Sequence, residues 1–451
     1  MKRLIILIFI CVVSFDATAQ INGGGAHPVA LTEALRLALD NSAQIKKSEL
    51  EREGTKQRIR LERGMSFPQV DAGISYDYFP VLETQFFSGE GFGQAGEYLP
   101  VQIGQPWQLN AGVKVEQVLY HETGRRAMPA IAVTRNLYDL LIEKSEEEVL
   151  FQTASLFYQT LQTQQLLRAV NANIEKLVAL ERIVELQLQN GFAIPTDVKR
   201  VQVAKTNLET TRQQLLSGIT ALQQSLQFMC GVPFDQPFQP VASLESPAAD
   251  SARWKNLQFT MEATTDYKLI EKQIELYHIQ WKSQRAEGWP TLSAHASAFY
   301  RAQRADFNVL DPNTQWYAMA TVGVKVKVPV FDGFRRHRKA DLLRLEEQKL
   351  QTDRKQLMGY KQLEYRQAVV ELENTLRQLR TQDQNVSLAR EIEDNLTLQY
   401  KEGVTPLSDV LNAQTMLSEA ETNYWQQVFA YKIAVLKLLK AAGQLEELYN
   451  L

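Results

Sequence analysis

Residues 402–410 read EGVTPLSDV, and residues 190–198 read NGFAIPTDV. In each stretch a glycine precedes an aspartate by six positions, and a glutamine, Gln202 or Gln414, follows that aspartate five positions later. Further matching pairs occur in the same order along the chain: RGMSFP at 63–68 with EGWP at 287–290, and GVKV at 112–115 with GVKV at 323–326. The sequence therefore predicts one structural unit that is present twice.

Each copy contains one very long predicted helix that ends at one of these glycines. Residues 335–401 hold no proline, and apolar residues recur there every seven positions. These are Leu343, Leu350 and Leu357, followed by Tyr365, Leu372, Leu379 and Val386. At about 1.5 Å per residue such a helix is roughly 100 Å long, and a seven-residue repeat favours packing along a neighbouring helix. We therefore expect extended helical hairpins and not a compact helical core.

Helix and turn signals set the boundaries of the two copies. Gly191 and Gly403 end the long helices, and Pro195 and Pro406 begin the return helices. The predicted first repeat follows a signal peptide at 1–19 and spans 20–230, with a helix, a β-hairpin at 69–119, a long helix at 124–190 and a return helix at 195–229. An equatorial linker is predicted at 231–262. The second repeat spans 263–442, with a helix, a β-hairpin at 291–331, a long helix at 335–401 and a return helix at 406–441, and a tail follows at 443–451.

The N-terminus predicts export from the cytoplasm. Lys2 and Arg3 precede an apolar run at 4–13, and Ala17 and Ala19 frame a cleavage site. This order is typical of a secretory signal peptide, and the run is shorter than the roughly 20 residues that a membrane-spanning helix needs.

The rest of the composition argues against several functional classes. Residues 20–451 carry 47 Lys and Arg against 51 Asp and Glu, and no basic run is interleaved with aromatic residues, so we expect no nucleic-acid partner. Cys230 is the only cysteine of that region and cannot form an intrachain disulfide. The five histidines lack metal-ligand spacing, and GFGQAG at 91–96 lacks the strand and helix of a nucleotide-binding loop. We therefore expect no metal, no cofactor and no enzymatic activity.

Apolar and polar residues alternate in four stretches, two in each copy. The stretches are 70–78, 109–116, 292–298 and 320–328. Strands of about ten residues can cross a bilayer when tilted, although a soluble, half-buried sheet has the same pattern. Four strands cannot close a barrel and lipid does not tolerate an open sheet edge, so a membrane barrel would need three chains and twelve strands. The polar residues that would then face a watery lumen include Lys114, Glu116, His295, Lys325 and Lys327.

The whole pattern resembles the TolC family of outer-membrane efflux proteins. The resemblance rests on the duplicated hairpins, on FDG at 331–333 and on the stretch 403–414, and the glycine-rich loop 80–106 is similar to versions common in the Bacteroidetes branch. The resemblance implies a mainly helical fold with a β-barrel part, in which three protomers form a helical tunnel in the periplasm and a twelve-stranded barrel in the outer membrane of a Gram-negative bacterium. The implied partners are two further copies of the chain, outer-membrane lipid, a periplasmic adaptor, and an inner-membrane pump of the RND, ABC or MFS type.

The resemblance also implies a constricted tunnel mouth near the second glycine. Family members carry a Tyr three positions before this glycine, an Arg two positions after it, and Asp residues six and nine positions after it. Those positions are Tyr400, Thr405, Asp409 and Asn412 here, so two match and two do not. Asp409 either forms a ring of three carboxylates that concentrates cations or flanks the start of the return helix. Asp197 is its equivalent in the first copy, and Arg200 follows on the same helical face.

The hairpin tips have two possible roles. Gly191, Pro195, Gly403 and Pro406 could mark the surface on which an adaptor docks, because a missing side chain permits close backbone approach. The glycines could equally do no more than end the helices. The expected function is passive conduction through an exit duct of a tripartite efflux or type I secretion system. The alternatives are a coiled-coil structural or adhesion protein without a pore, and a periplasmic adaptor.

Overall fold

The computed structural model describes residues 27–88, 98–236, 238–242, 254, 257–308 and 310–450. The predicted signal peptide and the GFGQAG stretch lie outside these residues. The chain forms two compact units. We call Met1–Asp40, Thr153–Glu245 and Gln382–Phe429 the hairpin unit, and Asn41–Gln152, Ser246–Thr381 and Ala430–Leu451 the sheet unit. The prediction of a mainly helical chain with four alternating strands is confirmed.

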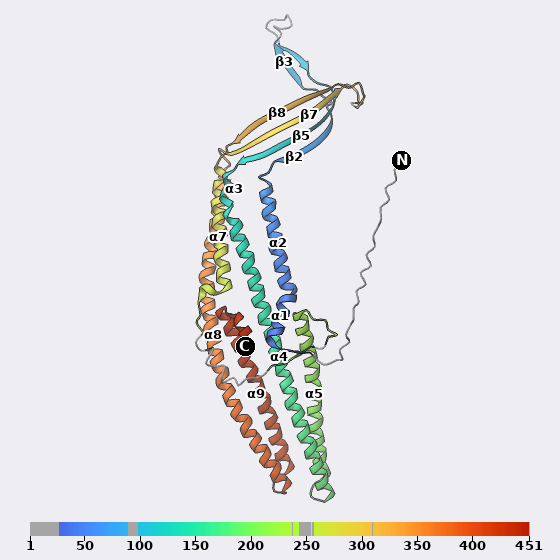
Figure 1. Ribbon diagram of the computed structural model, residues 1–451, viewed down its shortest axis with the longest axis vertical. Helices are drawn as coiled ribbons and strands as arrows, with labels where there is room; N and C mark the ends of the chain where they lie inside the picture. The colour runs from blue at the N-terminus through green and yellow to red at the C-terminus, as the bar shows by residue number, and fades with distance from the viewer. Residues whose placement is uncertain are drawn as a thin grey trace, which may run out of the picture. The chain divides into compact units, whose positions relative to one another are not determined.

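The sheet unit contains one antiparallel sheet of four strands in the order β2-β5-β7-β8 (Figure 1). Its strands are β2 (Gln69–Tyr78), β5 (Trp107–Tyr120), β7 (Thr291–Arg304) and β8 (Trp316–Lys327). β5 and β7, one from each copy of the repeat, pair with each other at its centre. β2 and β8 are therefore the edge strands.

The register of the strands sorts the side chains by polarity. One cross-strand row is Val70, Val115, Ala296 and Val322, and the next is Asp71, Lys114, Ser297 and Thr321. Successive residues of a strand point to opposite faces of the sheet, so these two rows lie on opposite faces. The alternation that the sequence shows in single strands is thus continued across all four, and the sheet has one apolar and one largely polar face.

The repeated GVKV glycines lie where two strands approach closely. A Cβ added at Gly112 would be 2.5 Å from the carbonyl oxygen of Ala298 and 2.9 Å from the Cα of Phe299. A Cβ added at Gly323 would be 2.8 Å from the ring of His295. Both glycines therefore leave room for a large side chain of β7 on the neighbouring strand.

The region between β2 and β5 contains more structure than the loop that the sequence predicts for residues 80–106. β3 (Thr84–Ser88) and β4 (Tyr98–Gln102) form a separate antiparallel hairpin there. The second predicted β-hairpin, at 291–331, is shorter than expected, because β8 ends at Lys327.

The first long helix is interrupted, and the prediction of one continuous helix at 124–190 is wrong. α3 (Glu122–Ala127) is followed by α4 (Pro129–Gln189). Pro129 has no backbone N–H, so the ladder of helical hydrogen bonds is interrupted at this residue, which occupies the first position of α4. Met128, before it, keeps helical φ and ψ angles, and its N–H bonds to the carbonyl of Gly124 at the end of α3.

The remaining helices complete the two copies. They are α1 (Leu31–Asn41), α2 (Ala43–Gly64), α5 (Pro195–Cys230), α7 (Thr265–Arg285), α8 (Arg335–Lys401) and α9 (Leu407–Ala442), with short 3₁₀ turns η2 (Met261–Ala263), η3 (Ala286–Gly288) and η4 (Leu445–Asn450). A parallel pair, β1 (His27–Val29) and β6 (Phe238–Pro240), belongs to the hairpin unit. Of the helices described, none is sufficiently long and apolar to traverse a membrane.

The core of the hairpin unit lies between its four helical segments. A cluster of buried apolar side chains comes from α4, α5, α8 and α9: Leu177, Leu180, Val184, Val201, Tyr400, Leu407 and Val410. Each of the four helices therefore contributes part of one face to this cluster.

We expect Gly112→Ala to destabilise the protein more than Gly323→Ala. The new methyl group at position 112 meets backbone atoms of β7, which cannot move without disturbing the β5–β7 pairing, whereas at position 323 it meets only the ring of His295. Overpacking of the first kind costs about 1–3 kcal/mol. Thermal unfolding of the purified variants in detergent measures the difference. Equal losses, or no rescue of Gly323→Ala by His295→Ala, would contradict this account.

Candidate channel wall and hairpin tips

The first strand-to-helix junction is organised by one buried carboxylate. Glu122, at the start of α3, is 2% exposed. It accepts hydrogen bonds from Arg125 Nε and Nη2, both at 2.6 Å, from Arg126 Nε at 2.7 Å and from the Tyr120 hydroxyl at 2.9 Å. The hydrogen bonds from Arg125 and Arg126 lower the pKa of Glu122 to about 2. This carboxylate therefore connects the last residue of β5 to the first turn of helix.

The second junction reaches a similar result with different residues. Asp332 accepts hydrogen bonds from the backbone N–H of Arg336 at 3.0 Å and from its Nε at 2.9 Å, at the start of α8. Gly333 and Phe334 follow with left-handed φ angles of 66° and 62°. The sequence predicts only this second turn, from its Asp-Gly pair. It does not predict the role of Glu122, although the glutamate followed by two arginines at 122–126 is a pattern that could have indicated it.

The register places all five predicted lumen residues on one face of the sheet. Lys114 Nζ lies 3.0 Å from Glu116 Oε2, and Glu116 is paired across the strands with His295. Lys325 is opposite Ser293 in β7, and Lys327 is opposite Thr291. These pairings alternate with the apolar rows, so the five side chains line one polar wall.

The two hairpin tips have the same helix-ending geometry. Gly191 has a φ of 78° and Gly403 a φ of 73°. After each glycine the next N–H bonds back to a helix carbonyl, from Phe192 to Gln187 at 2.8 Å and from Val404 to Gln399 at 2.9 Å. This is the Schellman pattern, which favours glycine because its left-handed conformation is strained for other residues. The helix-ending role of both glycines therefore follows directly from the backbone.

The tips also present apolar side chains without covering neighbours in the protomer. Phe192 is 84% exposed and Val404 is 74% exposed. A Cβ added at either glycine would meet no atom within 4 Å. The adjacent prolines, Pro195 and Pro406, mark the starts of the return helices. The surface of each tip is therefore open to another molecule.

The predicted aperture residues do not form one cluster. Tyr400 is buried in the apolar cluster of the hairpin unit, and burial, with a smaller effect from Asp197, raises the pKa of its hydroxyl. Asp409 and Asn412 are exposed and lie one turn apart on α9. Asp409 accepts hydrogen bonds from the hydroxyls of Thr405 at 3.3 Å and Ser408 at 3.2 Å, in the first turn of the helix. Asp409 thus has a local role at this helix start.

The equivalent residues of the first copy form a capping arrangement. Asp197 Oδ2 accepts the backbone N–H of Ile194 at 3.4 Å, and Arg200 lies 3.8 Å from Asp197. This carboxylate satisfies a backbone donor at the start of α5 and is favoured there by the helix dipole. The two copies therefore use their aspartates in similar positions.

Ion pairs between helices of the hairpin unit were not found from the sequence. Lys176 on α4 lies 2.7 Å from Glu393 on α8, whose side chain is 6% exposed, and Lys205 on α5 lies 2.6 Å from Glu181 on α4. Such pairs favour one arrangement of neighbouring helices over others.

In the part of the chain that the structure describes, no group of three or more His, Cys, Asp or Glu could hold a metal ion.

Residues 269–444 match the family model described as outer membrane efflux protein. The chain carries the outer membrane efflux protein domain. The match covers nearly all of the second repeat, and the first repeat has the same order of hairpin, long helix and return helix. The proteases secretion protein PrtF of Dickeya chrysanthemi is 22% identical over an alignment of 336 positions, which covers 70% of this chain and 66% of that protein.

Solved outer-membrane channels have the same fold as this chain. The outer membrane protein VceC of Vibrio cholerae aligns with a TM-score of 0.72 and 15% identity, over 92% of this chain and 96% of that one. The CmeC channel of Campylobacter jejuni gives 0.70 and 14%, over 92% and 85%. The open state of the MtrE channel of Neisseria gonorrhoeae gives 0.66 and 13%, over 92% and 88%.

We expect the Glu122 junction to make stability depend on acid. The pKa of Glu122 is lowered from 4.5 to about 2, so its contribution is complete above pH 4.5 and is lost as the pH falls toward 2. Glu122→Gln should lower the melting temperature at neutral pH and flatten its fall between pH 4.5 and pH 2. Circular dichroism in detergent measures this. Glu346→Gln, which removes an exposed carboxylate 3.7 Å from Lys349, is the matched control and should leave the pH profile unchanged.

Proposed function

We propose that this protein is the outer-membrane exit duct of a tripartite efflux or type I secretion system. It conducts substrates passively from the periplasm to the outside of a Gram-negative cell. The observation that carries the proposal is an open, four-stranded sheet with one apolar and one polar face, continuous with long helical hairpins.

The apolar face of the sheet argues against a soluble protein. Val322 is 85% exposed, Ile74 78%, Val324 66% and Val70 63% in the protomer. Soluble monomers rarely expose contiguous apolar patches larger than a few hundred Å². A half-buried soluble sheet would have this face covered by helices or a second sheet, yet the edge strands β2 and β8 are exposed along most of their length. The acyl chains of lipid are the environment that suits this apolar face.

The edges of the sheet argue for three protomers. The outer sides of β2 and β8 pair with no other strand in the described part of the chain. Unpaired backbone N–H and C=O groups are each costly in hydrocarbon, so a membrane sheet must close into a barrel. Three copies supply twelve strands, which is within the range of outer-membrane barrels. The polar wall with Lys114, Glu116 and His295 then surrounds the lumen.

The helical hairpins extend this duct into the periplasm. In the proposed trimer the four helical segments of each hairpin unit become a twelve-helix tunnel whose tips meet a periplasmic adaptor. An inner-membrane pump of the RND, ABC or MFS type supplies the energy. Tyr400, Asp409 and Asn412, with Asp197 and Arg200, lie near the tips and would line or support the tunnel mouth. The similar proteins include a proteases secretion protein and outer-membrane channels, which is consistent with a duct that serves an efflux or a secretion system.

Ion conduction by the purified protein tests the duct. We expect a heat-modifiable trimer in the outer-membrane fraction and stable pores in planar bilayers. Lys325→Glu with Lys327→Glu should shift the pore toward cations, because fixed charges in a narrow lumen concentrate counter-ions. Val322→Thr with Val324→Thr changes the opposite face of the same strand and should leave selectivity unchanged. A monomer that stays soluble without detergent would overturn the proposal.

Substitution at Gly403 tests docking at the tips. Asn tolerates the left-handed conformation that costs other residues about 1–2 kcal/mol, so Gly403→Asn preserves the helix end while adding a side chain at the tip. If an adaptor needs close approach there, export should fall at least about tenfold while trimer assembly stays intact. Gly231→Asn, at the left-handed end of α5, is the matched control. Normal export by Gly403→Asn would leave this glycine only its helix-ending role.

A further inference from the structure

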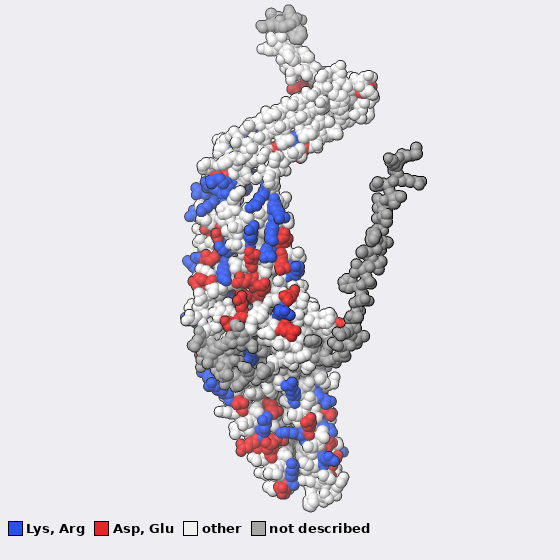
Figure 2. Space-filling model, viewed as in Figure 1, with Lys and Arg blue, Asp and Glu red and all other residues white. Residues whose placement is uncertain are grey.

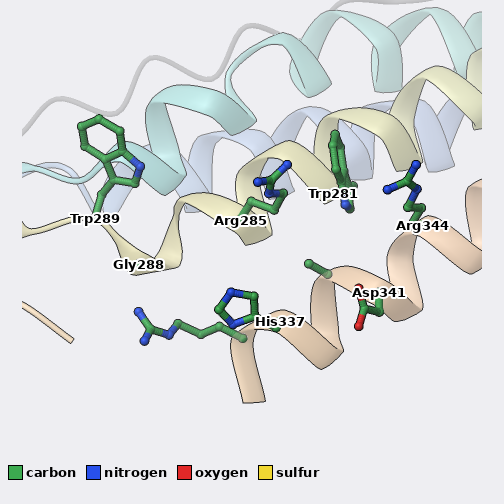
Figure 3. Close-up of a pocket in the computed structure, with 9 residues that line it drawn as sticks. Trp281, Arg285, Gly288, Trp289, His337, Asp341 and Arg344 are labelled. Carbon is green, nitrogen blue, oxygen red and sulfur yellow. The ribbon is translucent and has the colours of Figure 1, made fainter. Parts of the chain in front are cut away.

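A pocket with two aromatic rings and several arginines lies below the start of β7. It has a volume of about 530 Å³ and is formed between the end of α7 and the first turns of α8. Figure 3 shows Trp281, Arg285 and Trp289 on one side, and His337 and Arg344 on the other. All of its residues belong to the sheet unit.

Two guanidinium groups converge on one indole ring in this pocket. The Cζ of Arg285 lies 5.2 Å from the ring centroid of Trp281, and the Cζ of Arg344 lies 5.8 Å from it. Cation–π contacts hold each arginine there. Among the ion pairs of the described residues neither arginine has a carboxylate partner, whereas Asp341, which also lines the pocket, pairs with Arg338 at 3.3 Å. Two like charges at one ring repel each other, and a bound anion would relieve that repulsion.

The pocket belongs to a basic collar, which we define as the ends of the helices next to the strands, residues 58–63, 122–126, 282–287 and 332–344. These residues include twelve Lys and Arg against five Asp and Glu. The whole chain has a net charge of −3, so the excess is local. Figure 2 shows Lys and Arg gathered where the helices meet the sheet, whose surface carries few charged residues in this view.

Exposed aromatic residues accompany the collar. Trp289 is 51% exposed, and Phe331 and Phe334 are 74% and 63% exposed. Arg126 lies over the Trp289 ring, 5.8 Å from its centroid. Trp289 is two residues before β7, and Phe331 is four residues after β8. Aromatic rings beside basic groups at this level are typical of the boundary between hydrocarbon and headgroups.

We propose that the pocket between α7 and α8 binds the phosphate of an anionic phospholipid headgroup from the inner leaflet of the outer membrane. The inference rests on the proposed function, because the sheet must cross the bilayer for the collar to lie at headgroup level. Arginine matches phosphate oxygens with paired N–H donors, and the neighbouring Trp289 supplies apolar surface for the glycerol and the first acyl carbons. A second copy of the chain is a poorer occupant, because every copy carries the same basic collar.

The first copy of the repeat offers an internal comparison. Counted back from the shared prolines, Pro68 and Pro290, the residues equivalent to Trp289, Arg285 and Trp281 are Phe67, Arg63 and Ile59. The basic residue is present, but the indole that holds two guanidinium groups together is replaced by isoleucine. The site is therefore assigned to the second copy alone.

Lipid binding to the delipidated trimer tests the proposal. Native mass spectrometry and the thermal shift of the trimer would be measured with phosphatidylglycerol, with phosphatidylcholine, and with inorganic phosphate at equal phosphate concentration. We expect phosphatidylglycerol to bind best, and Arg285→Gln with Arg344→Gln to weaken it about tenfold or more, since each basic residue near an anionic surface contributes substantially. Arg335→Gln with Lys339→Gln removes the same charge from the collar outside the pocket and should change binding less than about twofold.

Each other outcome would overturn the lipid site. Equal losses in both double variants would mean diffuse attraction by the collar. Binding of inorganic phosphate as strong as that of phosphatidylglycerol would mean a soluble anion site. Pore conductance is recorded on the same preparations. If the pores are intact and lipid selectivity is absent, only this inference fails; if no trimeric pore forms, the proposed function fails with it.

Discussion

The unpaired backbone groups on the outer edges of β2 and β8 constrain the rest of this protein. A sheet with an exposed apolar face belongs in lipid, and lipid cannot satisfy hydrogen-bonding groups at a sheet edge. In the proposed barrel, closure would come from other copies of the chain, since the protomer has only four long strands in the described sheet. The sorting of polar and apolar rows in register fits the same proposal, because a closed barrel would have an inside and an outside.

The junctions between strands and helices are the second requirement. Each turn must end a sheet and begin a helix within a few residues, where the first helical N–H groups have no partner. Asp332 satisfies one of these donors by accepting a backbone N–H. Glu122 instead binds two arginine side chains of the first helical turn. Both junctions thus use a carboxylate that binds arginine, but the carboxylate occupies a different place in each half and only Asp332 also accepts a backbone N–H.

Periodic features could be predicted from the sequence, and features that depend on partners distant in the chain could not. Local rules that hold for any chain predict the strand alternation, the apolar repeat of α8 and the helix ends at Gly191 and Gly403. The burial of Tyr400 depends on side chains from three other helices, so its family-like position suggested a pore role that its surroundings do not display. Pro129 was visible, and the rule that proline prefers the first turn of a helix would have placed the break. The strands β3 and β4 carry no clear alternation that could have revealed them.

The replacement of Trp281 by Ile59 between the two halves has a consequence for the symmetry of the assembly. Six helix-to-strand junctions, from α2 to β2 and from α7 to β7 in each protomer, would surround a threefold barrel in two alternating kinds. Only one kind carries the indole between guanidinium groups, so the rim would alternate between sectors that retain a lipid molecule and sectors that let lipids exchange. The divergence of the two repeats would then give the surrounding lipid a threefold pattern of tightly and loosely bound molecules.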